Sequence, residues 1–358
     1  MHDCVLGGHV GTSIFEDGRR LLFFGGNDYL GLAGSGELEA AAIEAVHRFG
    51  VSSCASRTTT GTNELHLELE ERLAGFRGSE CARVIGAGYL ANRILLSVLL
   101  KPGGTVFCEK TVHPSAQDGI PRDIGRLVLF SRDDVAGFEQ LVKTSSPADV
   151  VLLDGVSTTG EIAPLDELMP SIRRYGLQLL VDDAHGIGVI GPGGRGTAAS
   201  FGLDPSEVVE AASMSKGFGS YGGFITGTRS TIDRVASLAP AYIGATALPP
   251  AVLGASLKAT ELVLAADDRR QRLRHLTQRV QRGFCDLGYE VSDHGTPILI
   301  FGEGEVGREL HEGLLRADVL VPHIQYPDPG GPCRIRLTLS AGHSDAQVDE
   351  LLAAAKAL

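Results

Sequence analysis

An aspartate, a histidine and a lysine lie at spacings that suit a single chemical site. Asp182 and His185 end an apolar run, in Val-Asp-Asp-Ala-His-Gly at residues 181–186, and Lys216 follows His185 by thirty-one residues in Ser-Met-Ser-Lys-Gly-Phe-Gly. Because Asp182 and His185 leave the end of a predicted strand together, we expect both side chains to lie over one ligand. The set supplies a carboxylate, an imidazole and a primary amine.

Pyridoxal 5'-phosphate is a cofactor that needs these three groups. It withdraws electrons only while its ring nitrogen is protonated, so an anion must lie beside that nitrogen, and Asp182 is the candidate. A lysine amine bonds covalently to the aldehyde and later acts as a base, which fits Lys216. An imidazole near the ring oxygen tunes the electronics, which fits His185. Each residue alone fits a helix cap or a solvated loop better than a cofactor site, but together, in this order and with the flanking glycines, they predict a cofactor site.

The composition indicates an ordinary globular protein. The 358 residues are 43% hydrophobic and 21% charged, with a formal net charge of −12. Because no basic stripe is present, we expect no nucleic-acid partner. We find no signal peptide and no apolar run of about twenty residues, and therefore expect a cytoplasmic protein without a membrane span. Neither a metal site nor a disulfide framework is expected from the six scattered cysteines, which are Cys4, Cys54, Cys81, Cys108, Cys285 and Cys333.

Short apolar runs alternate with helical patterns through the middle of the chain. The predicted strands are residues 126–130, 149–153, 177–181 and 223–227, and the predicted helices are residues 38–49, 64–76, 89–100 and 164–175. This alternation predicts an α/β fold with a mostly parallel sheet, in which ligands bind beyond the carboxyl ends of the strands. Asp182 and His185 fall at such an end.

The pattern changes after about residue 249, where long helices precede strands at 297–301 and 334–339 and a closing helix. We therefore expect an N-terminal segment (1–35), a large cofactor-binding domain (36–248) and a smaller C-terminal α+β domain (249–358). In the last strand, the period of two puts Arg334 and Arg336 on one face. An arginine there can hold a substrate carboxylate with two hydrogen bonds, and a surface arginine fits the same pattern.

Two loops add candidate binding residues. The sequence Ile-Gly-Ala-Gly-Tyr at 85–89 opens a helix and offers backbone N–H groups to a phosphate, and Tyr89 can shape the pocket, although a plain helix start fits as well. His113 lies in a predicted loop, where its imidazole can stack on a pyridine ring.

Read together, these motifs resemble the α-oxoamine synthase family of fold type I pyridoxal-phosphate enzymes. The likeness runs from Asn-Asp-Tyr-Leu-Gly at 27–31 to the C-terminal helix, and so covers nearly the whole chain. The landmarks between are Gly-Tyr-Leu-Ala-Asn at 88–92, His113-x-Ser115, Asp-Asp-Ala-His-Gly at 182–186, Lys216, Thr246 before two prolines, and Arg336 before Thr-Leu-Ser-Ala-Gly-His. The resemblance implies a large domain built on a seven-stranded, mostly parallel sheet and a smaller α+β domain.

The resemblance also implies an activity. It is the decarboxylative condensation of a small α-amino acid with an acyl thioester, carried by coenzyme A or an acyl carrier protein, to give an α-amino ketone, carbon dioxide and free thiol. A homodimer with shared active sites is implied as well. Two alternatives stay open: another fold type I reaction, such as transamination, racemisation or aldol cleavage, and an inactive cofactor-binding partner subunit.

Roles for individual residues follow from the resemblance by position. Lys216, His185 and His113 form the implied catalytic set, with His113 stacking on the cofactor ring and Asp182 beside its nitrogen. The other residues implied to contact the cofactor are Gly88, Tyr89, Ser157 and Ser213, together with Thr246, which reaches the phosphate from the other subunit. Asn27 and Arg336 are implied to bind the carboxylate of the amino acid.

Two stretches depart from the family pattern. A gap-free alignment puts Leu153 where many relatives have a glutamate, and a slip of one residue puts Asp154 there. The segment at 323–329 lacks the Ile-Arg-Pro-Pro-Thr pattern, whose arginine suits an acyl chain that ends in a carboxylate. On this ground the sequence does not favour a pimeloyl substrate.

Overall fold

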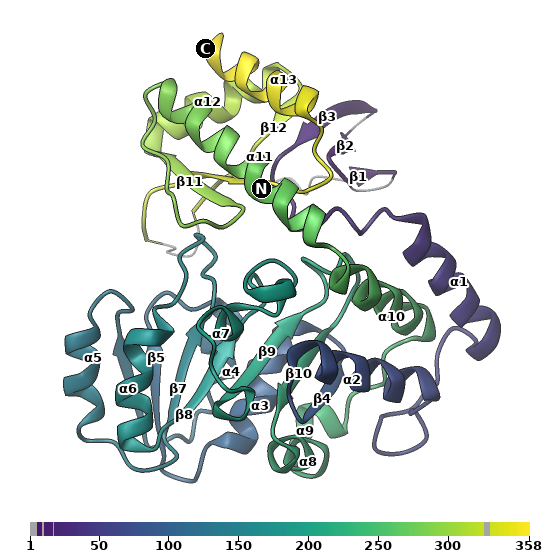
Figure 1. Cartoon of the computed structure of the whole chain (residues 1–358), viewed down its shortest axis with the longest axis vertical. Helices are drawn as coiled ribbons and strands as arrows, with labels where there is room; N and C mark the ends of the chain where they lie inside the picture. Colours follow the sequence, from purple (N-terminus) through teal and green to yellow (C-terminus); the bar gives the residue numbers. More distant parts are fainter. Residues whose placement is uncertain (1–5, 9–10, 17, 326–329) are drawn as a thin grey trace.

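Figure 1 shows the computed structural model, which describes residues 6–8, 11–16, 18–325 and 330–358. Its centre is a seven-stranded sheet. In spatial order the strands are β4 (Cys81–Ile85), β10 (Gly223–Gly227), β9 (Val208–Ser213), β8 (Gln178–Asp182), β7 (Val150–Asp154), β5 (Thr105–Glu109) and β6 (Arg126–Phe130). All neighbours are parallel except that β10 runs antiparallel to β4 and β9. The predicted α/β class and mostly parallel sheet are confirmed.

Helices cover both faces of this sheet. One face packs against α3 (Ala91–Leu99), α4 (Pro114–Gly119), α8 (Arg229–Leu238) and α9 (Pro240–Ile243), and the other against α5 (Val135–Val142), α6 (Leu165–Tyr175) and α7 (Thr197–Ser200). In β7, Val150 and Leu152 belong to the first core and Val151 and Leu153 to the second, so the strand is apolar on both sides. Short 3₁₀ helices lie at η1 (Gly88–Leu90), η2 (Pro192–Gly194) and η3 (Pro205–Glu207).

A third group of helices lies beside β4 and β10. It consists of α1 (Gly36–Phe49), α2 (Glu64–Arg77) and α10 (Pro250–Leu264), which share one apolar cluster. Their ends carry local signals: Ser35 caps α1 and Asn63 caps α2, each accepting a backbone hydrogen bond from the first turn. Because α10 packs on α1 and α2, the predicted domain boundary at residue 249 falls just before a helix that contacts the large sheet region.

The smaller part of the molecule is built on a three-stranded antiparallel sheet. Its strands are β11 (Ile298–Glu303), β14 (Arg334–Thr338) and β13 (His323–Ile324), and its helices are α11 (Asp267–Asp286), α12 (Gly304–Arg316) and α13 (Asp345–Lys356). The predicted smaller C-terminal α+β part is confirmed. The N-terminal strands join it as well: β1 (Leu6–Gly7), β2 (Ser13–Glu16) and β3 (Arg19–Phe23) form a sheet with β12 (Val319–Leu320).

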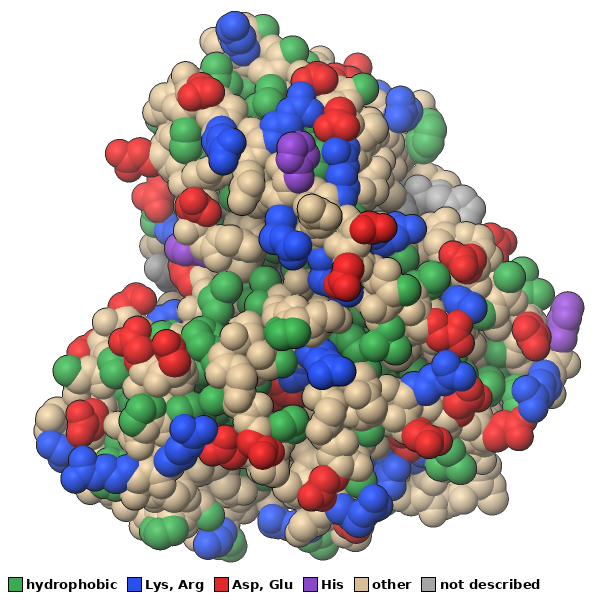
Figure 2. All heavy atoms as spheres, viewed as in Figure 1, with side chains coloured by type: hydrophobic (Ala, Val, Ile, Leu, Met, Phe, Trp, Pro, Cys, Tyr) green, Lys and Arg blue, Asp and Glu red, His purple; other side chains and the backbone are tan. Residues whose placement is uncertain are grey.

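Charges of both signs are interspersed over the face of the molecule in Figure 2. Among the described residues, no helix is long and apolar enough to span a membrane. The cysteines at positions 54, 81, 108, 285 and 333 are free thiols, and Cys4 lies outside the described residues.

Candidate active site

A cavity of about 180 Å³ lies beyond the carboxyl ends of β7 and β8. This is the edge of the sheet where open α/β folds bind ligands. The cavity brings together seven of the site residues predicted from the sequence, which lie far apart along the chain. Its lining residues are Gly88, Tyr89, His113, Ser115, Asp154, Val156, Asp182, Ala184, His185, Ser213 and Lys216.

Asp182 is the last residue of β8, and its carboxylate is held on both oxygens. The amide Nδ2 of Asn92, on α3, donates to Oδ2 at 2.6 Å, and the backbone N–H of Ala184 donates to Oδ1 at 3.1 Å. The side chain is buried, with 7% of its surface exposed. The carboxylate is therefore fixed in direction at the cavity wall.

Lys216 lies in the loop that joins β9 to β10 and is positioned by the backbone of that loop. The backbone N–H of Gly219 donates to the carbonyl of Lys216 at 2.9 Å, and Met214 N–H donates to Gly222 O at 3.0 Å. Burial lowers the pKa of the Lys216 amine from 10.5 to about 8, against the opposing effect of Asp182 and Asp154. The amine is thus more readily unprotonated than an ordinary lysine.

His185 contacts Tyr29, a residue of the N-terminal segment. The phenol oxygen of Tyr29 lies 2.6 Å from Nδ1 of His185, and both side chains are buried. Burial holds the pKa of His185 well below its ordinary value, and the nearby charges of Lys216 and Arg336 act in the same direction. The imidazole is therefore neutral at physiological pH.

His113 is held by the first turn of α4. Its Nδ1 accepts a hydrogen bond from the backbone N–H of Ser115 at 3.0 Å and lies 2.7 Å from the Ser115 hydroxyl. Its ring meets that of Tyr89 edge-on, with centroids 6.3 Å apart. Burial lowers the pKa of His113. The ring borders the cavity, as a stacking group would.

Asp154 places a second carboxyl group beside Asp182. The two residues are partners in the register of β7 and β8. Oδ2 of Asp154 accepts from the backbone N–H of His113 at 3.0 Å, whereas Oδ1 has no hydrogen-bond partner among the described residues. Burial, and then Asp182, raise the pKa of Asp154 well above its ordinary value. Leu153 packs in the core, so Asp154 and not Leu153 borders the cavity.

Arg336 and Asn27 lie next to this cavity rather than in its lining. Arg336 Nε donates to the carbonyl of Thr158 at 2.9 Å, and its Nη2 lies 3.4 Å from Asn27 Oδ1. The Tyr29 hydroxyl is 3.3 Å from the same Asn27 oxygen, which connects the pair to His185. Arg334, by contrast, forms an ion pair with Glu303 at 3.0 Å, so Arg336 is the strand arginine that faces the site.

Ser157 and Thr246 lie away from the cavity that contains Lys216. The Ser157 hydroxyl is buried and contacts Glu161 and Thr159. Thr246 is exposed and borders a different, much smaller cavity together with Arg57 and His66. Within one chain, therefore, Thr246 is not brought to Lys216.

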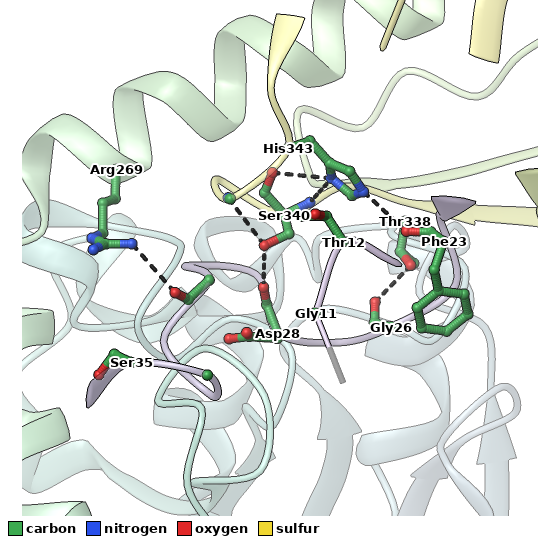
Figure 3. A pocket seen from close by; sticks show the side chains of 13 residues that line it. Gly11, Thr12, Phe23, Gly26, Asp28, Ser35, Arg269, Thr338, Ser340 and His343 are labelled. Carbon is green, nitrogen blue, oxygen red and sulfur yellow. Dashed lines mark hydrogen bonds between the residues drawn. The ribbon is translucent and has the colours of Figure 1, made fainter. Parts of the chain in front are cut away.

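A larger cavity, of about 330 Å³, lies on the side of segment 26–31 that faces the smaller part of the molecule (Figure 3). Side chains of the smaller part donate hydrogen bonds to the backbone of this segment. Thr338 Oγ1 donates to Gly26 O at 2.6 Å, Ser340 Oγ to Asp28 O at 2.6 Å, and Arg269 Nη1 to Leu30 O at 2.8 Å. These bonds fix the backbone that carries Asn27 and Tyr29.

Comparisons with known proteins identify the family. The profile described as aminotransferase class I and II matches residues 19–354. The chain is 38% identical over 355 residues to the 8-amino-7-oxononanoate synthase of Marinobacter nauticus, covering 98% of this chain and 90% of that protein. The chain belongs to the aminotransferase class I and II family.

Solved structures agree with this family assignment. Serine palmitoyltransferase from Sphingomonas wittichii superposes with a TM-score of 0.90 at 28% identity, over 97% of this chain and 89% of that one. The 8-amino-7-oxononanoate synthase of Francisella tularensis has a TM-score of 0.80 at 24% identity, which shows the shared fold. The predicted α-oxoamine synthase membership is confirmed: the chain is a pyridoxal-phosphate-dependent acyltransferase of the type that joins an amino acid to an acyl thioester with loss of carbon dioxide.

The residues around the cavity fit the cofactor of this family. An anchored carboxylate, a partly unprotonated amine and a ring-stacking imidazole surround the same space. Gly88 leaves room that a side chain would fill, because a Cβ there would lie 3.0 Å from the Cβ of Ser213. Oδ1 of Asp154 is a buried polar atom with no hydrogen-bond partner in the described part of the chain, and it can therefore bond to a ligand in the cavity.

Sequence reasoning did not assign roles to two residues of this site, Tyr29 and Asn92. Both belong to motifs that carry the family resemblance, so the sequence marks these positions without indicating what the side chains contact. Their contacts join residues 156 and 90 positions apart, which no local spacing reveals.

Proposed function

We propose that this protein condenses alanine with an acyl thioester, releasing carbon dioxide and free thiol. The observation that carries the proposal is the group of Lys216, Asp182 and His185 around one cavity. The amine supplies covalent attachment and proton transfer, the carboxylate supports a protonated ring nitrogen, and the imidazole borders the ring. Arg336 adjoins the group and supplies a cation for a substrate carboxylate.

Pyridoxal phosphate, when bound, supplies an electron sink that stabilises negative charge on the α-carbon of the amino acid. Lys216 would hold it covalently, and Asp182 would support its ring nitrogen. His113 would stack on the ring, and His185 would border the ring oxygen. Gly88, Tyr89 and Ser213 would bind its phosphate together with Thr246 of the second subunit. Ser157 lies outside this cavity and would contact the cofactor only indirectly.

Arg336 and Asn27 orient the amino acid by its carboxylate. The guanidinium donates from Nε to the carbonyl of Thr158 and from Nη2 to Asn27 Oδ1, and these contacts fix its direction for binding a carboxylate. Lys216 removes the proton from the α-carbon, because its lowered pKa, about 8, leaves part of the amine unprotonated near neutral pH. The same amine returns a proton to that carbon after carbon dioxide has left.

The names of the relatives support a choice of substrates. In 8-amino-7-oxononanoate, the amino-bearing carbon and its methyl group match alanine without its carboxylate, and the other carbons match a pimeloyl group. We therefore propose a pimeloyl thioester as the acyl donor. A second candidate is an acyl chain without a terminal carboxylate, favoured because residues 322–325 before β14 carry no arginine. The remainder of that segment, residues 326–329, lies outside the described residues.

The test compares two acyl donors on the holoenzyme. Carboxyl-labelled alanine is supplied with pimeloyl-CoA or with octanoyl-CoA, and labelled carbon dioxide and free thiol are measured together. We expect both products in equal amounts, only when both substrates are present, and faster with pimeloyl-CoA. Faster turnover of octanoyl-CoA selects the second candidate. Carbon dioxide without thiol, or an exchange of amino groups, contradicts the condensation.

A homodimer with shared sites belongs to the same proposal. It is supported by the position of Thr246, which is exposed and lines a different cavity from Lys216 of its own chain. Coenzyme A or a carrier protein as the thiol, and a cytoplasmic location, stay predictions.

A further inference from the structure

Tyr29 makes a short contact with the imidazole of the site. It is completely buried, and its hydroxyl oxygen lies 2.6 Å from Nδ1 of His185. The two rings are tilted by 50° with centroids 6.0 Å apart, so the contact is made by the hydroxyl group and not by stacking. A contact of this length between buried groups requires one proton between them.

The protonation states leave one exchangeable proton on each of the two groups. Burial raises the pKa of Tyr29 to about 12, so its hydroxyl is protonated and can donate. Burial lowers the pKa of His185, so its imidazole is neutral and carries one proton. If Nδ1 accepts the phenol proton, the single imidazole proton must lie on Nε2.

We propose that Tyr29 is a positioning residue that fixes His185 as a neutral imidazole with its proton on Nε2. Nδ1 is engaged by Tyr29, and His185 lines the cavity, so Nε2–H is left as a hydrogen-bond donor to the ligand there. This inference rests on the proposed function, in which the ring oxygen of the cofactor is that ligand. A fixed donor stabilises negative charge on the ring oxygen, whereas the other tautomer would present a lone pair to it.

The backbone around Tyr29 is anchored for this task. Ala341 N–H donates to the Tyr29 carbonyl at 2.8 Å, and Ser340 Oγ donates to the carbonyl of the preceding residue, Asp28 (Figure 3). The hydroxyl also lies 3.3 Å from Asn27 Oδ1, which in turn contacts Arg336. Tyr29 therefore connects the group beside the cofactor with the group that binds the carboxylate.

The test must account for every titratable group around His185. From the elements packed against it these are Tyr29, His113, Asp154, Asp182, Lys216 and Arg336.

The tautomer can be read directly in the cofactor-free enzyme. Nitrogen-15 labelling of histidine gives distinct shifts for protonated and unprotonated ring nitrogens, and His185→Gln assigns the signals. We expect the wild type to show an unprotonated Nδ1 and a protonated Nε2 across the pH range in which it is folded. In Tyr29→Phe we expect the other tautomer to appear and the pKa of His185 to rise by about one unit, because a hydrogen bond to the neutral form is lost.

Tyr289→Phe is the matched control. Tyr289 packs against the same core cluster as Tyr29, and no hydrogen bond of its hydroxyl is found among the described residues. We expect its histidine spectrum to match the wild type. A wild-type His185 protonated on Nδ1 overturns the proposal even if Tyr29→Phe fails to fold, and so does a folded Tyr29→Phe with unchanged shifts and titration.

A second readout separates this inference from the proposed function. With pyridoxal phosphate added, Tyr29→Phe is expected to gain the visible absorbance band of the wild type. The pH at which this band is half-titrated should differ from that of the wild type by about one unit. A visible band with an unmoved midpoint contradicts the role of Tyr29. No visible band in the wild type contradicts the proposed function, while the cofactor-free spectra still decide the tautomer.

Discussion

The amine of Lys216 is prepared to react with an aldehyde near neutral pH. Only the unprotonated amine is a nucleophile, and burial lowers its pKa from 10.5 to about 8. We expect the rate at which the cofactor-free enzyme forms its visible band to rise with pH and to level off above about pH 8. Rapid-mixing absorbance across pH 6 to 10 measures this. A rate that keeps rising to pH 10 indicates an ordinary lysine.

The second carboxyl group of the site costs stability at neutral pH. Because the pKa of Asp154 is higher in the folded than in the unfolded protein, stability falls as the pH rises above the unfolded value of 3.8. Asp154→Asn removes this effect and can still accept from His113 N–H. We expect the free energy of unfolding of the cofactor-free variant to exceed that of the wild type by about 1–2 kcal/mol at pH 8. The difference should be smaller at pH 5.

Urea unfolding at both pH values checks this expectation, with Asp118→Asn on the exposed side of α4 as the control. A variant that is destabilised more at pH 8 than at pH 5 shows that Asp154 is ionised in the folded protein.

The residue types that carry chemistry could be found in the sequence, whereas their supports could not. Short motifs with flanking glycines contain Asp182, His185 and Lys216 and indicate their roles. Tyr29 and Asn92 are of types that usually fill a core or cap a helix, and only the fold brings them to the site.

At the scale of elements, apolar strands were predicted well and strands with buried charge were not. The strand predicted at 177–181 is β8, which ends one residue later at Asp182, the site carboxylate. β9 was not predicted because Glu210 interrupts its apolar run. That glutamate is neutralised by Arg77 of α2 inside the protein, a pairing that the sequence does not reveal.

The turn after Lys216 sets the position of the whole loop. Gly219 has a φ of +61°, and a Cβ there would lie 2.7 Å from the carbonyl carbon of Leu32. Gly193 has the same φ but open space around it. We expect both alanine variants to lose about 1 kcal/mol to backbone strain, and Gly219→Ala to lose a further 1–3 kcal/mol to overpacking.

Gly219→Ala should also bind pyridoxal phosphate more weakly, since the loop that carries Lys216 must move. Thermal unfolding and cofactor titration of the two variants give the comparison. Equal effects at both positions contradict a packed contact between the lysine loop and the N-terminal segment.

At the scale of the whole molecule, segments near the two ends of the chain pack against each other. β3 pairs in parallel with β12, and Thr338 and Ser340 hold the segment that carries Asn27 and Tyr29. Period and composition show that both regions contain strands and polar turns. They do not show that strands nearly three hundred residues apart in sequence pair with one another, because register over such distances is set by the complete core.

A shared active site can be tested by mixing two inactive variants. Lys216→Ala removes the amine, and Thr246→Glu puts a negative charge where the phosphate of the other subunit is expected. If the two residues act from different subunits, mixed dimers contain one intact site, and random mixing should restore about a quarter of the wild-type activity. No recovery after unfolding and refolding the mixture indicates that each chain is complete by itself.

The central claim, that Lys216 holds the cofactor in the cavity with Asp182, is tested most directly by locating the covalent bond. The holoenzyme is reduced with borohydride, digested and analysed by mass spectrometry, with Lys110→Ala as a surface control. We predict the reduced pyridoxyl group on Lys216 alone, present in Lys110→Ala and absent from Lys216→Ala. A pyridoxyl group on any other lysine, or on none, contradicts the account.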